Sequence, residues 1–531
     1  MNALRTPGRR PAVPQVDGLF SMRQPMTVLR IQQGLVRGIE LDDVVVWRGI
    51  PYAQPPVGKL RWLPPQPPLP WAGTRDADRF AARSVQLRQG SAFPLRPESA
   101  EATDDPTRVS EDCLYINVCA PKSGGRELKP VLFWIHGGGF HTTSGPAFVG
   151  DGSQFARDGI VVVTFNYRLG ALGFLYLGQL LGPEYETSGT CGLQDQIAAL
   201  RWVKDNIEAF GGDPSRVTIA GNSAGAKSVS SLLAAPSASG LFRRAISQSG
   251  GQHVADRTMA SRLAHRFLHK AGLDRKNAAS LLRLEADQIL AAQVALGTGV
   301  QATWIWRPSV DGIVLPSEPL TALSGAVANG VDMIAGTNSN EAATYDILDR
   351  SAAEQAPRVI KDIFGPDAES FWIDYRSSRV GSEDRNIWRA AMGDERYVVP
   401  TIRLLDAQSK HASVWRYRFD CQGHLPADFK GGHGTEMPFV FKLAPEKLKP
   451  ASRAMAQQMH MAWASFIQGA APMAPGLPRW PLYDALERQT MIFDDVPRVE
   501  SDPNRREREQ WDNRALLESP WWTEAQLGGS S

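Results

Sequence analysis

Short, uninterrupted apolar runs recur along the chain and predict the buried strands of one sheet. They lie at Val131–Ile135, Ile160–Thr164 and Val217–Ala220, with a weaker run at Val331–Ala335 and a further strand at Ser413–Asp420. Strands that are apolar at nearly every position are typical of a sheet covered on both faces, because neither side of such a strand meets water.

Helical periodicity fills the intervals between these runs. Over Gln194–Phe210 apolar residues recur at steps of three and four, and a glycine pair at 211–212 ends the pattern. The segments 257–328 and 351–408 are also mainly helical, apart from a turn near Asp311. Because strands alternate with helices, we expect an α/β fold with a mostly parallel central sheet flanked by helices.

The start of the chain follows a different pattern. Thr27–Ile50 alternates between apolar and polar residues and predicts antiparallel hairpins, which would form a small N-terminal β region. Residues 1–26 hold no apolar stretch long enough for a signal peptide or a membrane span, and we expect this segment to be disordered. No linker divides the remainder, so residues 27–531 are expected to form a single domain elaborated by the two helical insertions.

Composition narrows the classes of partner. Lys and Arg number 58 and Asp and Glu number 56, and no basic run carries interleaved aromatics, so we do not expect nucleic acid binding. The four cysteines have neither metal-ligand spacing nor a disulfide framework. They are Cys113, Cys119, Cys191 and Cys421. We therefore expect reduced thiols, no metal and a cytoplasmic location without a membrane anchor.

The stretch Gly221–Gly225 carries the strongest chemical signal. Its Gly-x-Ser-x-Gly pattern lies between the strand Val217–Ala220 and a helix expected over Ala226–Leu233, which places Ser223 on a sharp turn. Small flanking residues let such a turn expose the serine hydroxyl, as a nucleophile requires. A glycine-rich turn with an incidental serine is the simpler alternative.

A second glycine loop precedes this one. His136–Phe140 follows the strand at Val131–Ile135, and its three glycines allow backbone N–H groups to approach a ligand, as an oxyanion hole requires. The expected donors are Gly138, Gly139 and Ala224. A flexible turn is the alternative for the loop alone.

A nucleophilic serine needs a base and an orienting acid, which follow the serine in this type of hydrolase. His433 lies in a glycine-rich loop after the strand Ser413–Asp420, where a histidine reaches the top of a sheet. Glu341 follows the strand Val331–Ala335, at the end of the sheet where sites form in open α/β folds. The residues that remain open are His424 for the base, and Asp346 and Asp394 for the acid.

These motifs together resemble the type-B carboxylesterases, the α/β-hydrolase family that also contains the cholinesterases and the bacterial para-nitrobenzyl esterases. The resemblance runs from about Gly34 to Tyr483. It is carried by Arg48–Ala53, Ser110–Leu114, the Gly-Gly-Gly-Phe loop, Asn166–Arg168, Phe210–Pro214 and Ser247–Gly250. It implies Ser223 as nucleophile, Glu341 as acid, His433 as base and helical insertions that cover an active-site gorge. Ser249, in the last of these motifs, and Asn222 are expected to support these residues.

The resemblance also implies a reaction. His433 would take the Ser223 proton as the serine attacks an ester carbonyl, and water would then hydrolyse the acyl-enzyme. Only a small-molecule ester and water are required, with no metal or organic cofactor, and the oligomeric state is left open. Amide, carbamate or thioester hydrolysis by the same triad is the alternative, and a non-catalytic adhesion protein is a remote one.

Two departures from the family pattern change the expectations. Asn222 replaces the usual glutamate beside the nucleophile, which removes a negative charge that would stabilise the imidazolium of the base, so we expect activity to extend to lower pH. Cys113 lacks the upstream cysteine with which many secreted members pair it, since residues 83–86 read Arg-Ser-Val-Gln.

Substrate identity is indicated only by apolar and aromatic residues near the motifs. The candidates for lining an acyl or alcohol pocket are Phe140, His141, Trp304, Trp306, Met437 and Phe439. They favour a hydrophobic ester, such as an aryl ester.

Overall fold

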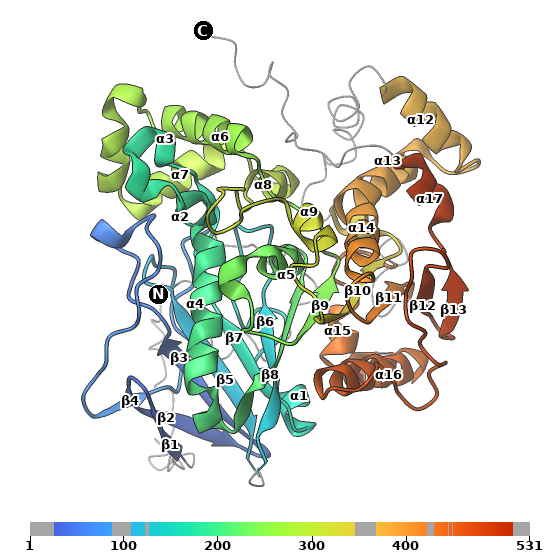
Figure 1. Cartoon of the computed structure of the whole chain (residues 1–531), viewed down its shortest axis with the longest axis horizontal. Helices are drawn as coiled ribbons and strands as arrows, with labels where there is room; N and C mark the ends of the chain where they lie inside the picture. The colour runs from blue at the N-terminus through green and yellow to red at the C-terminus, as the bar shows by residue number, and fades with distance from the viewer. Residues whose placement is uncertain are drawn as a thin grey trace, which may run out of the picture.

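A single sheet runs through the protein, which is described from a computed structural model over residues 26–87, 108–122, 127–345, 368–421, 430–443, 445–448 and 450–512 (Figure 1). Within these residues thirteen strands pair in the order β1-β2-β3-β5-β7-β6-β8-β9-β10-β11-β12-β13, with β4 beside β2. All pairings from β7 to β12 are parallel, which confirms the mostly parallel sheet expected from the apolar runs.

The strands have the following bounds. The N-terminal group is antiparallel, as expected, and comprises β1 (Met26–Ile31), β2 (Gly34–Leu41) and β3 (Val44–Pro51), with β4 (Thr74–Asp76) joining β2 in parallel. The others are β5 (Tyr115–Pro121), β6 (Lys129–Ile135), β7 (Val161–Phe165), β8 (Gly212–Asn222), β9 (Arg244–Gln248), β10 (Asp332–Asn338), β11 (Val414–Phe419), β12 (Gln489–Phe493) and β13 (Arg498–Ser501).

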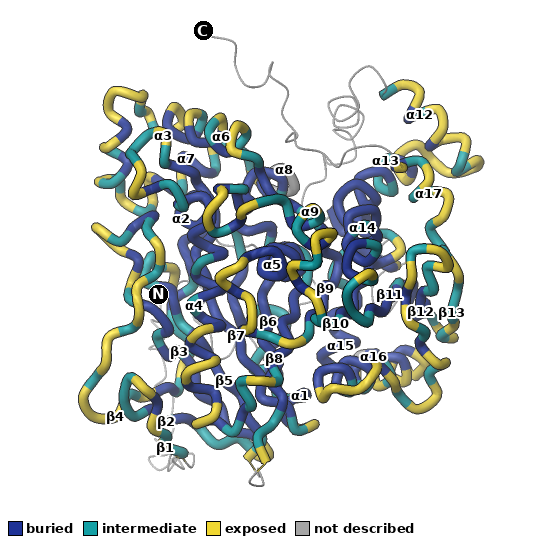
Figure 2. The backbone as a smooth tube through the Cα atoms, in the orientation of Figure 1, coloured by how far each residue is buried: buried dark blue, intermediate teal, exposed yellow. Residues whose placement is uncertain are grey.

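The helices cover both faces of this sheet. Alternate residues of β6 enter two different cores, because Phe133 packs in the cluster that includes α4 (Cys191–Asn206) and α5 (Ala224–Ala234), whereas Trp134 packs with α16 (Pro450–Ile467). Figure 2 shows the central strands buried between these layers. A strand that meets protein on both sides is apolar at successive positions, which explains the uninterrupted runs in the sequence.

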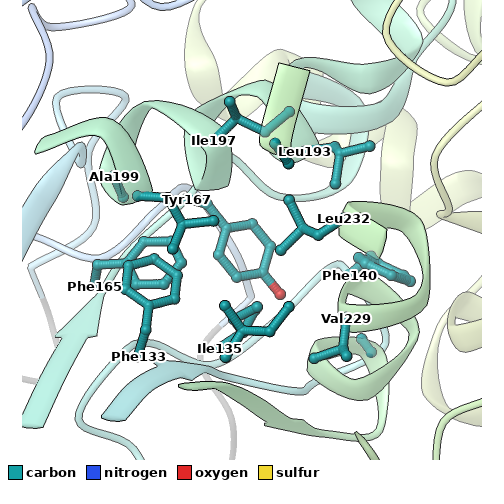
Figure 3. Close-up of a cluster of buried hydrophobic side chains, with 14 of the residues drawn as sticks. Phe133, Ile135, Phe140, Phe165, Tyr167, Leu193, Ile197, Ala199, Val229 and Leu232 are labelled. Carbon is teal, nitrogen blue, oxygen red and sulfur yellow. The ribbon is translucent and has the colours of Figure 1, made fainter. Parts of the chain in front are cut away.

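The core beneath the functional region joins β6 to α4 and α5. Figure 3 shows Phe133, Phe140 and Tyr167 among the aliphatic side chains of these helices, and Phe133 stacks on Phe165 with ring centroids 4.6 Å apart. The stacking of Phe133 on Phe165 joins β6 to the end of β7, and the shared core packs both strands against α4, so the loop that follows Ile135 starts from a rigid point.

Two groups of helices follow β9 and η8 (Glu341–Thr344) in the chain. The first contains α6 (Arg257–Lys270), η7 (Arg275–Arg283), α7 (Ala286–Leu296), α8 (Gly299–Ile305) and α9 (Pro319–Ser324). The second contains α12 (Ala368–Ser377), α13 (Asp384–Gly393), a π-helical turn η10 (Asp394–Val398) and α14 (Val399–Gln408), while 351–367 lie outside the described residues. Figure 1 shows α6 and α7 together at one end of the molecule, and α13 and α14 near β10 and β11.

Shorter helical elements complete the described chain. They are η1 (Gly58–Leu60), α1 (Ser153–Arg157), α2 (Gly170–Phe174), α3 (Gly178–Leu181), η3 (Pro183–Tyr185), η4 (Ser188–Thr190), η5 (Ile207–Phe210), η6 (Pro236–Ala238), η8 (Glu341–Thr344), α15 (Met437–Val440), η12 (Pro445–Lys447) and α17 (Arg505–Gln510).

One central strand has no counterpart among the apolar runs. β9 reads Arg-Ala-Ile-Ser-Gln and lies between β8 and β10, although its last two residues are polar. Ser247 and Gln248 are nevertheless fully buried, and Gln248 donates to the Glu436 carboxylate at 3.1 Å. A buried strand that ends in polar residues gives no continuous hydrophobic signal, which is why the sequence pattern missed it.

Several sequence expectations concern chemistry rather than fold. The four cysteines are free and buried. Among the described residues no group of three or more His, Cys, Asp or Glu side chains could hold a metal ion. In the same part of the chain, no helix has both the length and the apolar character needed to cross a membrane. Residues 1–25 lie outside the described part, so the disorder expected there stays a prediction, as does the single-domain division.

A buried ion pair ties the loop after β7 to α4. The Arg168 guanidinium donates to the two carboxylate oxygens of Asp195 at 2.8 and 2.7 Å, and its backbone N–H donates to the same carboxylate at 3.0 Å. The two side chains are only 3% and 0% exposed. The next residue back, Tyr167, donates its hydroxyl to the His136 carbonyl at 2.9 Å, so the ion pair also supports the glycine loop.

Replacing Asp195 should therefore destabilise the whole fold. We expect Asp195→Asn to lower the free energy of unfolding by about 3–5 kcal/mol, because it leaves the Arg168 charge buried and uncompensated. Chemical denaturation measures this quantity. The control is Asp205→Asn near the end of the same helix, where the side chain is exposed and the expected change is within about 0.5 kcal/mol. Equal effects of the two variants would contradict the assignment.

Candidate active site

Ser223 occupies the sharp turn between β8 and α5. Its backbone has φ 59° and ψ −123°, a conformation that L-residues rarely adopt, and its N–H donates to the Gln248 carbonyl at 2.9 Å. A Cβ atom at Gly225 would collide with the Ile135 carbonyl, and one at Gly221 would collide with Gly225 itself. The two glycines therefore let the strand and helix approach closely enough to hold this strained turn.

Glu341 and His433 meet at the same edge of the sheet. Glu341 begins η8 just after β10, and its carboxylate lies 2.6 Å from Nδ1 of His433. The other carboxylate oxygen accepts from the Ser249 hydroxyl at 2.6 Å and from the Asn338 N–H at 2.7 Å. An acceptor this close to Nδ1 places the proton on that nitrogen and leaves Nε2 of His433 as an acceptor. Ser249 thus donates directly to the Glu341 carboxylate.

Ser223 and His433 line one cavity of about 350 Å³. The Ser223 hydroxyl and Nε2 of His433 are not hydrogen bonded to each other, and Nε2 has no partner among the described residues. Hydrogen bonds between such groups are often long without substrate and tighten on binding. The arrangement brings together a strained serine, an imidazole with a free nitrogen and a buried carboxylate behind it.

The glycine loop after β6 lies beside the serine. Gly138 and Gly139 have φ values of 99° and 60°, and the Gly138 carbonyl accepts from the N–H groups of His141 and Thr142, both at 3.1 Å. No acceptor in the described chain takes the N–H of Gly138, Gly139 or Ala224. Three such donors near Ser223, one of them at the start of α5, are suited to stabilise a developing oxyanion.

Asn222 contacts the carboxylate of Glu436. Its Nδ2 donates to Glu436 at 2.9 Å, and Gln248 and Asn338 donate to the same carboxyl group at 3.1 and 2.7 Å. Glu436 is fully buried, and burial raises the pKa of its carboxyl group while the Asn338 hydrogen bond partly offsets this. The site therefore keeps an acidic group three residues after His433, despite the asparagine beside Ser223.

The structure corrects part of the expected pocket. His141 and Met437 line the cavity, and burial lowers the pKa of His141 to about 4, which leaves it neutral. The other four candidates do not line it. Phe140 packs on Phe174, Trp306 on Phe267, Phe439 on Phe419, and Trp304 lies against Tyr345. Being large and apolar, these side chains bury their area in the cores beneath the loops rather than at the cavity surface.

Other lining residues come from elements that carry no motif. The helical insertions contribute Gln293, Val294, Ala302, Thr303 and Tyr397, and Tyr345 follows Glu341 by four residues. Their positions depend on how the insertions fold over the sheet, so no local pattern marks them. The competing acid Asp394 instead contacts Tyr375 and lies 3.4 Å from Arg379, whereas Asp346 and His424 lie outside the described residues.

Comparison with known proteins places this geometry in a family. The family model described as the carboxylesterase family matches residues 25–511. The para-nitrobenzyl esterase of Bacillus subtilis (strain 168) is 33% identical over 501 residues, which cover 91% of this chain and 98% of that protein. The fumonisin B1 esterase of Sphingopyxis macrogoltabida is 34% identical over 484 residues, which cover 87% of this chain and 85% of that protein.

Solved structures agree with the sequence comparisons. A carboxylesterase of Geobacillus stearothermophilus superposes with a TM-score of 0.81 at 38% identity, covering 91% of this chain and all of that one. A para-nitrobenzyl esterase structure gives 0.79 at 32% identity, covering 91% and 99% of the two chains. The chain therefore belongs to the carboxylesterase family and is a carboxylic-ester hydrolase with the α/β-hydrolase fold.

Proposed function

We propose that the protein hydrolyses uncharged, hydrophobic carboxylic esters through a Ser223–His433–Glu341 triad and an acyl-enzyme. The observation that carries the proposal is the meeting, in one cavity, of the strained Ser223 with a histidine whose Nδ1 is held at 2.6 Å by the buried Glu341 carboxylate. If the glycine motifs were only turns, there would be no reason for Ser223 and the His433–Glu341 pair to meet in one cavity.

The first step is attack on the ester carbonyl. Nε2 of His433 accepts the Ser223 proton as Oγ bonds to the carbonyl carbon, and Glu341 stabilises the resulting imidazolium through Nδ1. The N–H groups of Gly138, Gly139 and Ala224 receive the negative charge on the carbonyl oxygen. When the tetrahedral intermediate collapses, the imidazolium returns its proton to the leaving alcohol. Water then repeats the sequence on the acyl-enzyme and releases the acid.

Ser223→Ala should abolish this chemistry without unfolding the protein. We expect kcat/KM for an aryl ester to fall by roughly 10⁴-fold or more, because the nucleophile and its covalent intermediate are both lost. Ser230→Ala, a buried serine further along α5, is the control and should retain activity. Labelling with a fluorophosphonate and mapping of the adduct give an independent check. An adduct elsewhere than Ser223, or an active Ser223→Ala protein, would overturn the assignment.

The charge of the cavity supports the substrate class. Among the described residues that line it, none is Asp, Glu, Lys or Arg, and much of the wall is apolar, including Val294, Ala302, Met437, Pro438 and Leu443. A charged acyl or alcohol group would lose its hydration there without gaining a partner.

A matched pair of aryl esters tests this preference. We expect kcat/KM for 4-nitrophenyl butyrate to exceed that for the mono-4-nitrophenyl ester of succinic acid by at least about a hundredfold, because burial of an unpaired carboxylate costs several kcal/mol. Steady-state kinetics at neutral pH measure the ratio. Comparable values would refute the uncharged substrate class. The 4-nitroanilide and the thioester of butyric acid, and a 4-nitrophenyl carbamate of similar size, are assayed in parallel. Their rates decide between ester hydrolysis and the alternative reactions.

The contact of Asn222 with Glu436 changes the expected pH behaviour. The activity at low pH expected from the sequence assumed that no carboxylate remains beside the site, but Glu436 lies 2.9 Å from Asn222. A glutamate at position 222 would share a proton with Glu436, since two carboxylates in contact cannot both ionise. The net charge near Ser223 would then change little.

We therefore expect Asn222→Glu and Asn222→Gln to have nearly the same acidic limb in the pH profile of kcat/KM. The difference should be less than about half a pH unit, well below the ~1–3 units that an unshared carboxylate produces. Asn222→Gln is the control because it has the same length without the charge. If the limb of Asn222→Glu lies a full unit above that of Asn222→Gln, the proton is not shared and the expectation from the sequence alone is restored.

A further inference from the structure

Tyr397 contacts the histidine of the proposed triad although no motif marks it. It lies in the π-helical turn η10, its ring is almost fully buried and lines the cavity, and it stacks on the His433 imidazole. The two ring centroids are 4.4 Å apart and the ring planes differ by 25°. Single π-helical turns inside α-helices are frequent at functional sites, because the extra residue turns side chains away from the regular helical face.

The hydroxyl of Tyr397 is also engaged. Tyr345 donates its hydroxyl to that of Tyr397 at 2.8 Å, and both groups are buried. Burial raises the pKa of Tyr397, while the charge of Arg396 opposes it most, followed by the hydrogen bond from Tyr345 and, least, one from Ser223. The tyrosine therefore faces both members of the proposed nucleophile–base pair, one with its ring and the other with its hydroxyl.

The turn that carries Tyr397 is anchored on its other side. Nη1 of Arg396 lies 2.8 Å from both ring nitrogens of His253, and Nη2 donates to the Thr303 carbonyl. The same guanidinium lies 4.2 Å from the ring centroid of Trp304. Burial, together with this guanidinium, lowers the pKa of His253 well below its usual value, so His253 stays neutral and accepts the bond. These contacts hold the backbone of η10 against the first helical insertion.

Lys227 adds a contact from the helix of the nucleophile. It follows Ser223 by four residues on α5, and its Nζ lies 4.7 Å from the centroid of the Tyr397 ring. Its side chain is 2% exposed. The ring thus connects α5, which begins at the nucleophile, with the loop that carries the base.

We propose that Tyr397 is a positioning residue for the Ser223–His433 pair. Its ring fixes the plane of the imidazole so that Nε2 stays directed at the cavity, and its hydroxyl orients the Ser223 hydroxyl, with Tyr345 and Lys227 holding the tyrosine in place. The assignment rests on the proposed function, since it concerns the groups of that triad. A misplacement of about 1 Å between reacting groups costs up to ~10²-fold in rate, so such a support has a measurable effect.

Two variants separate the ring from the hydroxyl. Tyr397→Phe keeps the stacking and should lower kcat about fivefold, the equivalent of one ordinary hydrogen bond. Tyr397→Leu removes both contacts and should lower kcat by about 10²-fold. KM should stay within about twofold of the parent value in Tyr397→Phe, because this variant keeps the ring that lines the cavity. Tyr375→Phe is the control, since it removes another buried tyrosine hydroxyl of the second insertion that does not line the cavity.

A spectroscopic signature distinguishes positioning from general structural support. The Nδ1–H proton of His433, held at 2.6 Å from Glu341, should resonate far downfield in the proton NMR spectrum and persist in Tyr397→Phe. In Tyr397→Leu we expect this signal to broaden or disappear while the denaturation midpoint shows that the protein is folded. Labelling of Ser223 by a small fluorophosphonate should slow in parallel with kcat.

These experiments test the role of Tyr397 independently of the proposed triad. Unchanged kcat in Tyr397→Leu, with Ser223→Ala inactive, would overturn the role of Tyr397 and leave the triad standing. If Tyr397→Leu does not fold, Tyr397→Phe decides, and a kcat within twofold of the parent with an unaltered labelling rate would overturn the role. Activity in Ser223→Ala would instead remove the proposed function on which the assignment rests.

Discussion

The close approach of backbone around Ser223 is the constraint on which the site depends. The strand–helix turn holds Ser223 in a strained conformation only because Gly221 and Gly225 let β8, α5 and the end of β6 touch. Gly137 extends the same packing, since a Cβ atom there would lie 2.7 Å from the Asn222 carbonyl. The serine hydroxyl and the expected oxyanion donors are thus fixed relative to each other by main-chain contacts, which leave little freedom for rearrangement.

Charge is distributed unevenly around this rigid centre. Among the described residues, the cavity wall holds no Asp, Glu, Lys or Arg, whereas charged groups of these types lie buried behind it. Glu341 and Glu436 face the base and the nucleophile turn, and each accepts several hydrogen bonds. On the side of Tyr397, Lys227 and Arg396 are buried. Substrate therefore meets a neutral, largely apolar surface, while the charges act across short distances of low dielectric.

The two helical insertions contribute differently from the sheet. The sheet supplies the residues with recognisable spacing, because each lies just after the carboxyl end of a strand, where an open α/β fold forms its sites. The insertions supply part of the cavity wall, including Thr303 and Tyr397. The positions of their side chains depend on packing against residues distant in sequence. Substitutions in the insertions would therefore change the cavity and leave the glycine turns intact.

The sequence by itself determined the parallel sheet and the strand–turn–helix at Ser223, because these depend on local signals: continuous apolar runs and paired glycines. Residue order and strand ends favoured Glu341 and His433 but left His424, Asp346 and Asp394 open, and the family resemblance pointed to the same two residues. Only the tertiary structure decided that Asn222 meets Glu436, that Phe140 and Trp306 pack in the core rather than line the cavity, and that Tyr397 stacks on His433. These contacts join residues up to about two hundred positions apart or depend on which face of a loop turns inward. Apolar periodicity carries no information on contacts of either kind. It also missed β9, which ends in buried polar residues, one of which, Gln248, donates to Glu436 on another element.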